Sequence, residues 1–184
     1  MSSLEGQLLI AMPGMLDPNF SETVTFICKH DADGAVGIVV NRPSDMSLGD
    51  VCRQLELETR LGDEADQPVM NGGPVHPDRG FVLHQSDETF DSTFDPDADV
   101  KVTVSQDVLK AIASGTGPKP ALVALGYAGW AAGQLESEMA ANAWLSVPTS
   151  PDILFETPIE QRWQAAAGII GIDIRQVTSY AGHA

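Results

Sequence analysis

The sequence predicts an α+β fold with a mixed sheet, and three observations predict it. Several short segments alternate apolar and polar residues, the period of a half-buried strand, and others repeat apolar residues every three to four positions, the period of an amphipathic helix. The predicted elements follow one another as strands, helix, strands, helix, strand, helix, helix, with no linker or internal repeat between them. The 184 residues, of which 43% are hydrophobic, suffice for one domain (1–184) with a substantial core.

The first pair of strands is predicted over residues 23–43, as a β-hairpin. Val24, Phe26 and Cys28 alternate on one face of the first strand. The segment DADG supplies turn residues, and its Gly34 can adopt a positive φ. The return run is apolar on both faces, so we expect it in the middle of the sheet.

A short helix is predicted after the hairpin, where Ser47 is a natural N-cap. Asp50 stands three residues later, as in a capping box, and the apolar residues of SLGDVCRQLEL share one helical face. The polar stretch 56–67 then predicts a loop. The stretch 87–99 contains six acids and no base, and it predicts a second, solvated loop.

The middle of the chain predicts two more strands and a helix. Alternating valines place a half-buried strand over residues 100–105, and Ser105 is expected to cap a helix that ends near Gly115. The apolar run ALVALGYAG (121–129) predicts a buried strand that leads into a turn at its glycines.

Two helices are predicted toward the C-terminus. The first covers residues 133–145, with Leu135 and Met139 on its buried face. The segment TPIE begins the second with a threonine N-cap, a proline at the first position and a glutamate at the third. Gly171 ends this helix, and Trp163 is expected to anchor it in the core. Its apolar stripe consists of Ile159, Trp163, Ala167 and Ile170.

The chain is strongly acidic, with 10 Lys+Arg against 26 Asp+Glu and a formal net charge of −16. A field of this sign repels phosphate backbones and anionic membranes, and the few cations form no basic stripe, so we expect no direct DNA binding. The longest apolar run (121–132) is too short and too rich in glycine for a membrane helix. Cys28 and Cys52 lack metal-ligand spacing and are expected to be reduced core residues of a cytoplasmic protein.

The common catalytic and nucleotide-binding motifs do not occur in the sequence. The stretch GGPVHPDRGFVLH, from Gly72 to His84, is the first of two segments rich in functional residue types. Its glycines predict a turn whose N–H groups can also face an anion, and Arg79 suits a carboxylate or phosphate. His76, His84 and Asp78 allow a metal site, but His84 follows the strand alternation and is better explained as structural, so we predict no metal or cofactor.

The second segment covers residues 126–138, within LGYAGWAAGQLESE. Its three glycines near Tyr127 and Trp130 predict that another chain segment or a ligand approaches the backbone closely. Glu136 and Glu138 lie near the start of a helix, where carboxylates interact favourably with the helix dipole. Because they are two residues apart they do not share a helical face, so a paired-carboxylate site on this helix is not expected.

Both segments follow apolar strands, and we predict that they meet at one rim of the sheet and form a shallow pocket for a small polar ligand or a partner's loop. The glycines would supply N–H donors and the aromatic residues would form the walls. The alternative is that the glycines simply let two loops pack. The predicted ligand- or partner-binding residues are Gly72, Gly73, Arg79, His84, Tyr127, Trp130 and Glu136.

Six stretches of the sequence together resemble the AlgH/YqgE family of bacterial proteins. The resemblance spans nearly the whole chain, and it implies an α+β fold with a mixed, mostly antiparallel sheet, partly curled into a small barrel and surrounded by helices. Members are often labelled transcriptional regulators, although no activity is established for the family as a whole. The stretches are AMPGMLDPNF, HDADGAVGIVVNRP, GGPVHPDRGFVLH, ALGYAGWAAGQLESEMAANAWL, ILFETPIEQRW and AGHA.

From these observations we expect a non-enzymatic regulatory or binding protein that acts in the cytoplasm through an unidentified protein or small-molecule partner. Two alternatives remain open. One is an enzyme that uses the segments 72–84 and 126–138, and the other is a transcriptional regulator that binds DNA directly. The missing catalytic motifs weigh against the first alternative, and the net charge weighs against the second.

Overall fold

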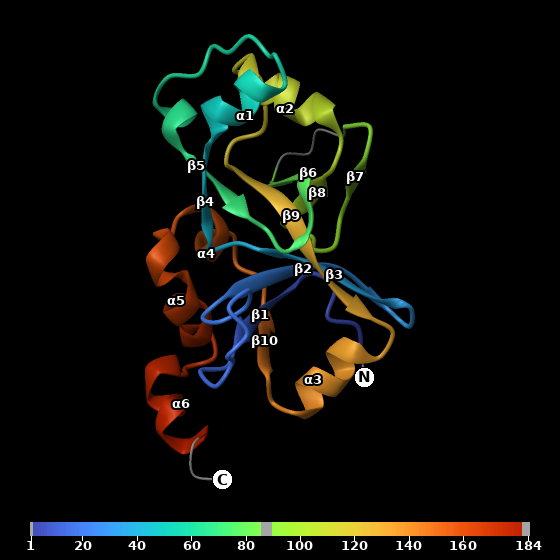
Figure 1. The fold of residues 1–184 in the computed structure, drawn as a ribbon, viewed down its shortest axis with the longest axis vertical. Coiled ribbons are helices and arrows are strands. Elements are labelled where there is room, and N and C mark those ends of the chain that lie inside the picture. Colours follow the sequence, from blue (N-terminus) through green and yellow to red (C-terminus); the bar gives the residue numbers. More distant parts are fainter. Residues whose placement is uncertain (1, 86–89, 182–184) are drawn as a thin grey trace.

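The computed structural model describes residues 2–85 and 90–181, which form an α+β fold around one mixed, mostly antiparallel sheet (Figure 1). The strands are β1 (Gln7–Ala11), β2 (Val24–Asp31), β3 (Gly34–Val39), β4 (Pro43–Ser47), β5 (Pro68–Asn71), β6 (Val75–His84), β7 (Thr93–Phe94), β8 (Lys101–Thr103), β9 (Ala121–Ala131) and β10 (Trp144–Pro148). The helices are α1 (Leu48–Gln54), α2 (Gln106–Ala113), α3 (Gln134–Ala140), α4 (Pro151–Phe155), α5 (Arg162–Gly168) and α6 (Ile174–Ala181). None of the helices in the described part of the chain is long and apolar enough to span a membrane.

Strand β9 is the central strand of the sheet, and its 11 residues run through both halves of the molecule (Figure 1). The strand order is β10-β1-β2-β3-β9-β6-β8-β7, and β4 joins this path through β5, which also pairs with β9. The β5–β9 pair is parallel, whereas every other pairing among the described residues is antiparallel. The sheet curls into a half-barrel, as the family resemblance implied.

The predicted hairpin and the predicted capping box are confirmed. β2 and β3 pair antiparallel from Thr25↔Val39 to Asp31↔Gly34, and Gly34 has a φ of +136°. β3 also pairs with β9, which explains why its residues are apolar on both faces. At the start of α1 the Ser47 hydroxyl accepts from the Asp50 N–H at 3.1 Å, and the Asp50 carboxylate accepts from the Ser47 N–H at 2.9 Å.

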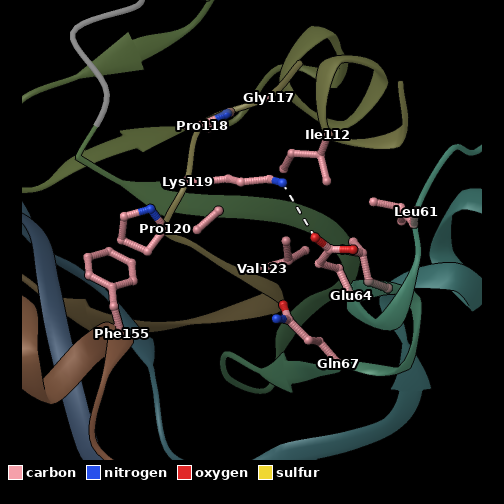
Figure 2. A pocket seen from close by; sticks show the side chains of 12 residues that line it. Leu61, Glu64, Gln67, Ile112, Gly117, Pro118, Lys119, Pro120, Val123 and Phe155 are labelled. Atoms are coloured by element: carbon pink, nitrogen blue, oxygen red, sulfur yellow. Dashed lines mark hydrogen bonds and ion pairs between the residues drawn. The ribbon is translucent and has the colours of Figure 1, made fainter. Parts of the chain in front are cut away.

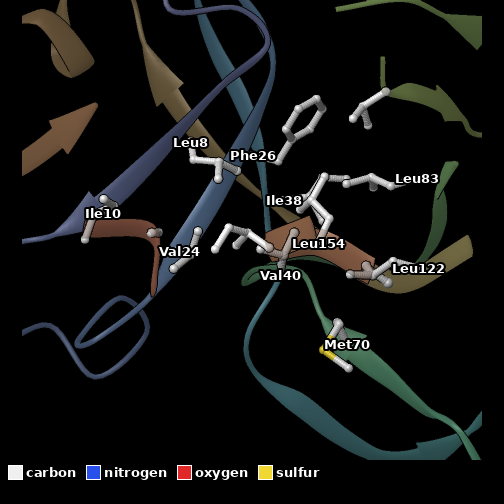
Figure 3. Close-up of a cluster of buried hydrophobic side chains, with 14 of the residues drawn as sticks. Leu8, Ile10, Val24, Phe26, Ile38, Val40, Met70, Leu83, Leu122 and Leu154 are labelled. Atoms are coloured by element: carbon white, nitrogen blue, oxygen red, sulfur yellow. The ribbon is translucent and has the colours of Figure 1, made fainter. Parts of the chain in front are cut away.

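The buried side chains form three clusters, separated by the sheet. The main cluster lies between the sheet and helices α4, α5 and α6, and Figure 3 shows Leu8, Phe26, Ile38 and Leu122 in it with Leu154 of α4. A second cluster lies under α3 and contains Trp130, Leu135 and Trp144. The third lies under α1 and α2.

At Gly126 the side chains of β9 change sides, so that the alternation of faces before this residue does not continue after it. Before it, Leu122 and Ala124 face the main cluster; after it, Tyr127 packs against that cluster while Trp130 joins the second one. A regular strand keeps residues of one parity on one face. The positive φ of Gly126 (+80°) breaks that alternation, as an irregular glycine in a strand does.

Three predictions about secondary structure were wrong in detail. The glycines of GYAG form no turn, because β9 continues through them to Ala131. The helix predicted over 133–145 ends at Ala140, since Asn142 has a φ of +60° and Trp144 begins β10, which pairs with β1. Ile170 lies past the end of α5 and is 45% exposed, so it does not extend the apolar stripe.

The two predicted loops are mostly irregular, but each contains a short regular element. Within 56–67, residues Asp63–Asp66 form a single 3₁₀ turn. Residues 87–89 of the acidic stretch lie outside the described part of the chain. The rest of that stretch contains β7, which pairs with β8. Ser105 occupies the N-cap position of α2 as predicted, but its hydroxyl donates to the Asp107 carboxylate and accepts from the Ser92 N–H, and it caps no N–H of the helix.

Candidate functional site

The connection from β5 to β6 crosses over β9, and this crossing explains the glycines of both motif segments. β5 and β6 pair with opposite edges of β9, so residues 72–74 must pass across its face. A Cβ at Gly72 or Gly73 would overlap the backbone of Gly126 or Tyr127, and a Cβ at Gly126 would overlap the Gly73 carbonyl. The two segments therefore meet, as predicted, but their glycines meet through backbone packing, which was the alternative to a shared pocket.

The N–H groups of the crossing are already engaged, contrary to the prediction that they would face a ligand. Gly72 N–H donates to the Leu125 carbonyl at 2.8 Å, and the Gly72 carbonyl accepts from Val39 N–H at 2.9 Å. Gly73 N–H donates to the Asn71 side-chain oxygen at 3.3 Å. Gly72 and Gly73 thus have a structural role, because they allow the backbones to approach.

Next to the crossing, β6 bulges away from β9 and presents Arg79. The pairing jumps from Val75↔Tyr127 to Gly80↔Leu125, so residues 76–79 have no partners on β9. His76 has a φ of +43°, which is a strained conformation for a residue other than glycine. Its ring lies 5.9 Å from that of Tyr127.

Aromatic contacts extend from the bulge into the sheet. Phe81 and Tyr127 meet edge to face with their ring centroids 5.8 Å apart, and the guanidinium carbon of Arg79 lies 6.0 Å from the centre of the Phe81 ring. This last distance is at the outer limit of a cation–π contact. Arg79 is exposed, so its guanidinium is held near an aromatic ring but remains accessible to a ligand.

These side chains border a hollow of about 430 Å³, which we call the Arg79 hollow. Its lining is mostly apolar, with three charged side chains among the nine residues. Cys28 is buried there, and burial raises the pKa of its thiol, so the thiol is not an activated nucleophile. A second hollow of about 500 Å³ lies beside α1 and α2 and shares Arg79 and Val104 with the first. The Arg79 hollow is lined by Glu5, Cys28, Lys29, Val36, Arg79, Phe81, Phe94, Val104 and Tyr127.

The other predicted site residues do not join this hollow. Trp130 lies in the second core cluster, across the strand from Tyr127, so the two aromatic residues do not wall one pocket. Its indole N–H donates to Glu138 at 3.1 Å, and that of Trp144 donates to the same carboxylate oxygen at 2.9 Å. His84 is fully buried, and its Nε2 lies 2.7 Å from the Thr103 hydroxyl. Gly73 lines a separate hollow of about 130 Å³.

Glu136 pairs with His30, a residue that sequence reasoning did not select. His30 is buried, and its Nδ1 accepts from the Leu4 N–H at 2.9 Å. The other ring nitrogen must then carry the proton of a neutral imidazole, so Nε2 donates to the Glu136 carboxylate at 3.0 Å. Glu136 therefore holds the N-terminal segment and α3 together through His30, away from Arg79.

The Glu136–His30 bond predicts an acid-sensitive contribution to stability. The hydrogen bond from His30 holds the pKa of Glu136 below its ordinary value of 4.5. A depressed carboxyl pKa stabilises the folded state above the unfolded pKa, and this stabilisation is lost as the pH falls through the folded pKa. We expect Glu136→Gln to lower the melting temperature at about pH 7, and we expect this difference from the wild type to disappear at a pH acidic enough to protonate Glu136 in the folded protein. Glu58→Gln, at an exposed position, serves as the control. An equal deficit of Glu136→Gln at both pH values would contradict the assignment.

The described residues contain no group of three or more His, Cys, Asp or Glu side chains placed to hold a metal ion. In particular, His84 is buried beside Thr103, whereas His76 and Asp78 are exposed on the bulge. The Arg79 hollow presents one guanidinium, one ammonium and one carboxylate (Glu5) beside an aromatic surface, a lining suited to hold a ligand with both polar and apolar parts.

Comparison with known proteins places this architecture in a family. The AlgH-like family model matches residues 8–175. A UPF0301 protein of Xanthomonas campestris pv. campestris (strain B100) is 51% identical, over 98% of this chain and 96% of its own length. A UPF0301 protein of Saccharophagus degradans is 52% identical, over 99% of this chain and 89% of its own.

Two solved structures share the fold. The solution structure of the AlgH protein from Pseudomonas aeruginosa has a TM-score of 0.80 and 48% identity, covering 100% of this chain and 99% of that one. A crystal structure of a Corynebacterium diphtheriae protein has a TM-score of 0.77 over 96% of this chain and 92% of that one, but only 17% identity, and so shows the fold alone. With the family model matched over most of its length and relatives near 50% identity, this chain belongs to the AlgH-like family.

Proposed function

We propose that this chain is a binding protein that holds a small molecule with an apolar body and one anionic group in the Arg79 hollow. The volume of about 430 Å³ falls within the range of about 300–1,000 Å³ typical of small-molecule sites. Phe81, Phe94 and Tyr127 offer ring surfaces to the apolar body. Arg79 and Lys29 are two of only ten Lys and Arg residues in an acidic chain, and both line this one hollow, where they outnumber its single carboxylate, Glu5.

The observation that carries the proposal is the strained bulge that presents Arg79. A strand that only completed the sheet would keep its register with β9, whereas β6 leaves it over residues 76–79 and places His76 at a positive φ. Backbone strain of this kind costs about 1–3 kcal/mol and is concentrated at binding and catalytic sites. Bulges have the same distribution, because they redirect a side chain at the edge of a site.

The test uses 8-anilinonaphthalene-1-sulfonate, which has an aromatic body and one anionic group. We expect saturable binding by the wild type, measured by fluorescence titration and calorimetry. Arg79→Gln should weaken binding about tenfold, because a charge-assisted hydrogen bond contributes about 1.5–3 kcal/mol and 1.4 kcal/mol corresponds to a factor of ten. Arg60→Gln removes an exposed arginine that lines none of the hollows described here, and it should bind as the wild type does.

Equal dye affinity in the Arg79→Gln and Arg60→Gln proteins would contradict the proposed site. Because Arg79 is exposed and forms no ion pair with another described residue, Arg79→Gln should keep the melting temperature of the wild type. A change in binding can then be separated from a change in folding. Added salt should weaken dye binding to the wild type more than dye binding to Arg79→Gln. Salt screens the attraction between the sulfonate and the Arg79 guanidinium, and the variant lacks this attraction.

We further propose that the protein works in the cytoplasm and that any regulatory role acts through this ligand or through a partner that recognises the occupied state. Cys28 and Cys52 are both buried and free, which fits a reducing compartment. The net charge of −16 favours such an indirect role over contact with DNA, since non-specific affinity for DNA comes mainly from neutralisation of phosphates.

A further inference from the structure

A second candidate binding region lies between the α1 segment and α4. Two hollows of about 310 and 200 Å³ adjoin there through shared lining residues, and we call the two together the Arg162 trough. Figure 2 shows the larger hollow, with Phe155 and Pro120 on one side, Leu61 and Glu64 opposite, and Lys119 paired with Glu64 at 3.4 Å. The shared lining residues are Leu48, Gln67, Ala121, Val123 and Phe155.

The smaller hollow is lined by a buried arginine that has no carboxylate partner. Arg162 is only 7% exposed. Its Nε donates to the Thr157 carbonyl at 3.0 Å and its Nη1 to the Val40 carbonyl at 2.5 Å. No carboxylate of the described residues lies within salt-bridge distance, although Glu160 is near enough to favour the charged form. Nη2 makes no hydrogen bond with any described residue.

A buried cation without a counter-charge is costly, and this cost favours an anion in the trough. Carbonyl groups satisfy two donors of Arg162 but carry no full negative charge, and Glu160 acts on the guanidinium only from beyond salt-bridge distance. Burial therefore lowers the pKa of Arg162. A carboxylate next to Nη2 would supply the missing charge and a charge-assisted hydrogen bond. The guanidinium is fixed at both of its carbonyl contacts, so a ligand would meet a donor that is already oriented.

The remaining lining of the smaller hollow favours a ligand with an apolar body. Ten of its twelve lining residues are apolar, and Gln67 and Arg162 are the two exceptions. Several of these side chains, including Val69, Met70 and Leu154, also belong to the buried clusters, so the wall is rigid. The larger hollow continues this surface past Phe155 and Val123.

We propose that the Arg162 trough binds a small alkyl carboxylate, with its carboxylate on Arg162 and its chain along Val123 and Phe155 toward the larger hollow. The trough shares no lining residue with the Arg79 hollow, so the two sites are independent. The proposal therefore does not rest on the function proposed above.

The test compares octanoate with octanamide, which has the same chain but no charge. We expect saturable calorimetric binding of octanoate to the wild type and at least about tenfold weaker binding of octanamide. Gln67→Glu adds a negative charge at an exposed position on the trough. It should lower the affinity for octanoate several-fold without unfolding the protein. Gln164→Glu adds the same charge at an exposed position outside the lining, and it should have little effect.

Arg162→Lys and Arg79→Gln complete the assignment. Arg162→Lys keeps the charge but loses the planar guanidinium that donates to the Val40 and Thr157 carbonyls, and it should weaken octanoate binding. Arg79→Gln should leave octanoate affinity unchanged. Equal binding of octanoate and octanamide, no saturable binding, or a loss confined to Arg79→Gln would each overturn the proposal. The last result would support the Arg79 hollow at the expense of the trough.

Discussion

Gly73→Ala is expected to destabilise the protein by about 4 kcal/mol or more, enough to prevent folding of many domains. The added Cβ would overlap the Tyr127 carbonyl and the Ala128 nitrogen, and both groups belong to the backbone of the central strand. Neither can move without breaking the β3–β9 or β6–β9 pairing. Gly73 also has a φ of +153°, which an alanine rarely adopts. Urea unfolding followed by circular dichroism measures the loss.

Gly115→Ala is the matched control for this experiment. Gly115 has a positive φ of +83°, but a Cβ there would meet no atom within 4 Å. Its replacement by alanine should lower the free energy of unfolding by only about 1–2 kcal/mol, the penalty for placing alanine in the left-handed conformation. Equal effects of the two substitutions would show that the crossing over β9 is looser than described, and that conformation rather than contact decides the need for glycine.

Trp163→Ala is expected to cost about 3–5 kcal/mol, in line with other large-to-small replacements in a core. Trp163 is 8% exposed and packs in the main cluster, as the sequence predicted. Its indole N–H also donates to the Ala11 carbonyl at 2.9 Å, which links α5 to the end of β1. For a chain of this length each kcal/mol lowers the melting temperature by roughly 2–4 °C.

Trp163→Phe separates packing from the hydrogen bond. Phenylalanine retains most of the apolar volume but leaves the Ala11 carbonyl without its donor, at a cost of about 1–3 kcal/mol. A thermal melt of Trp163→Ala within error of the wild type would show that α5 is not anchored through this side chain. A melt of Trp163→Phe as low as that of Trp163→Ala would assign the effect to the hydrogen bond alone.

The sequence predicted the local elements because their signals lie within a few residues. The hairpin turn at Gly34, the Ser47–Asp50 capping box and the Trp163 position each depend on neighbouring residues or on a short period. The faces of β9 could not be predicted in the same way. One left-handed glycine, Gly126, reverses the alternation, and nothing in the local pattern distinguishes it from the turn glycine that we expected.

The candidate site was predicted only in part, because most of its contacts join distant segments. Arg79 and Tyr127 share a hollow, but Trp130 turns to the opposite face and Glu136 pairs with His30, which is 106 positions away. The carbonyl partner of Arg162 on Val40 is 122 positions away. Periodicity carries no information about such pairs, since they depend on how the sheet brings its strands together.

The most direct test of the Arg79 hollow is a crystal structure of the protein with bound 8-anilinonaphthalene-1-sulfonate. We predict that the ring system lies against Phe81 and Tyr127 and that the sulfonate lies within hydrogen-bond distance of the Arg79 guanidinium. Dye bound elsewhere, with the Arg79 hollow unchanged and filled by solvent, would contradict the central claim.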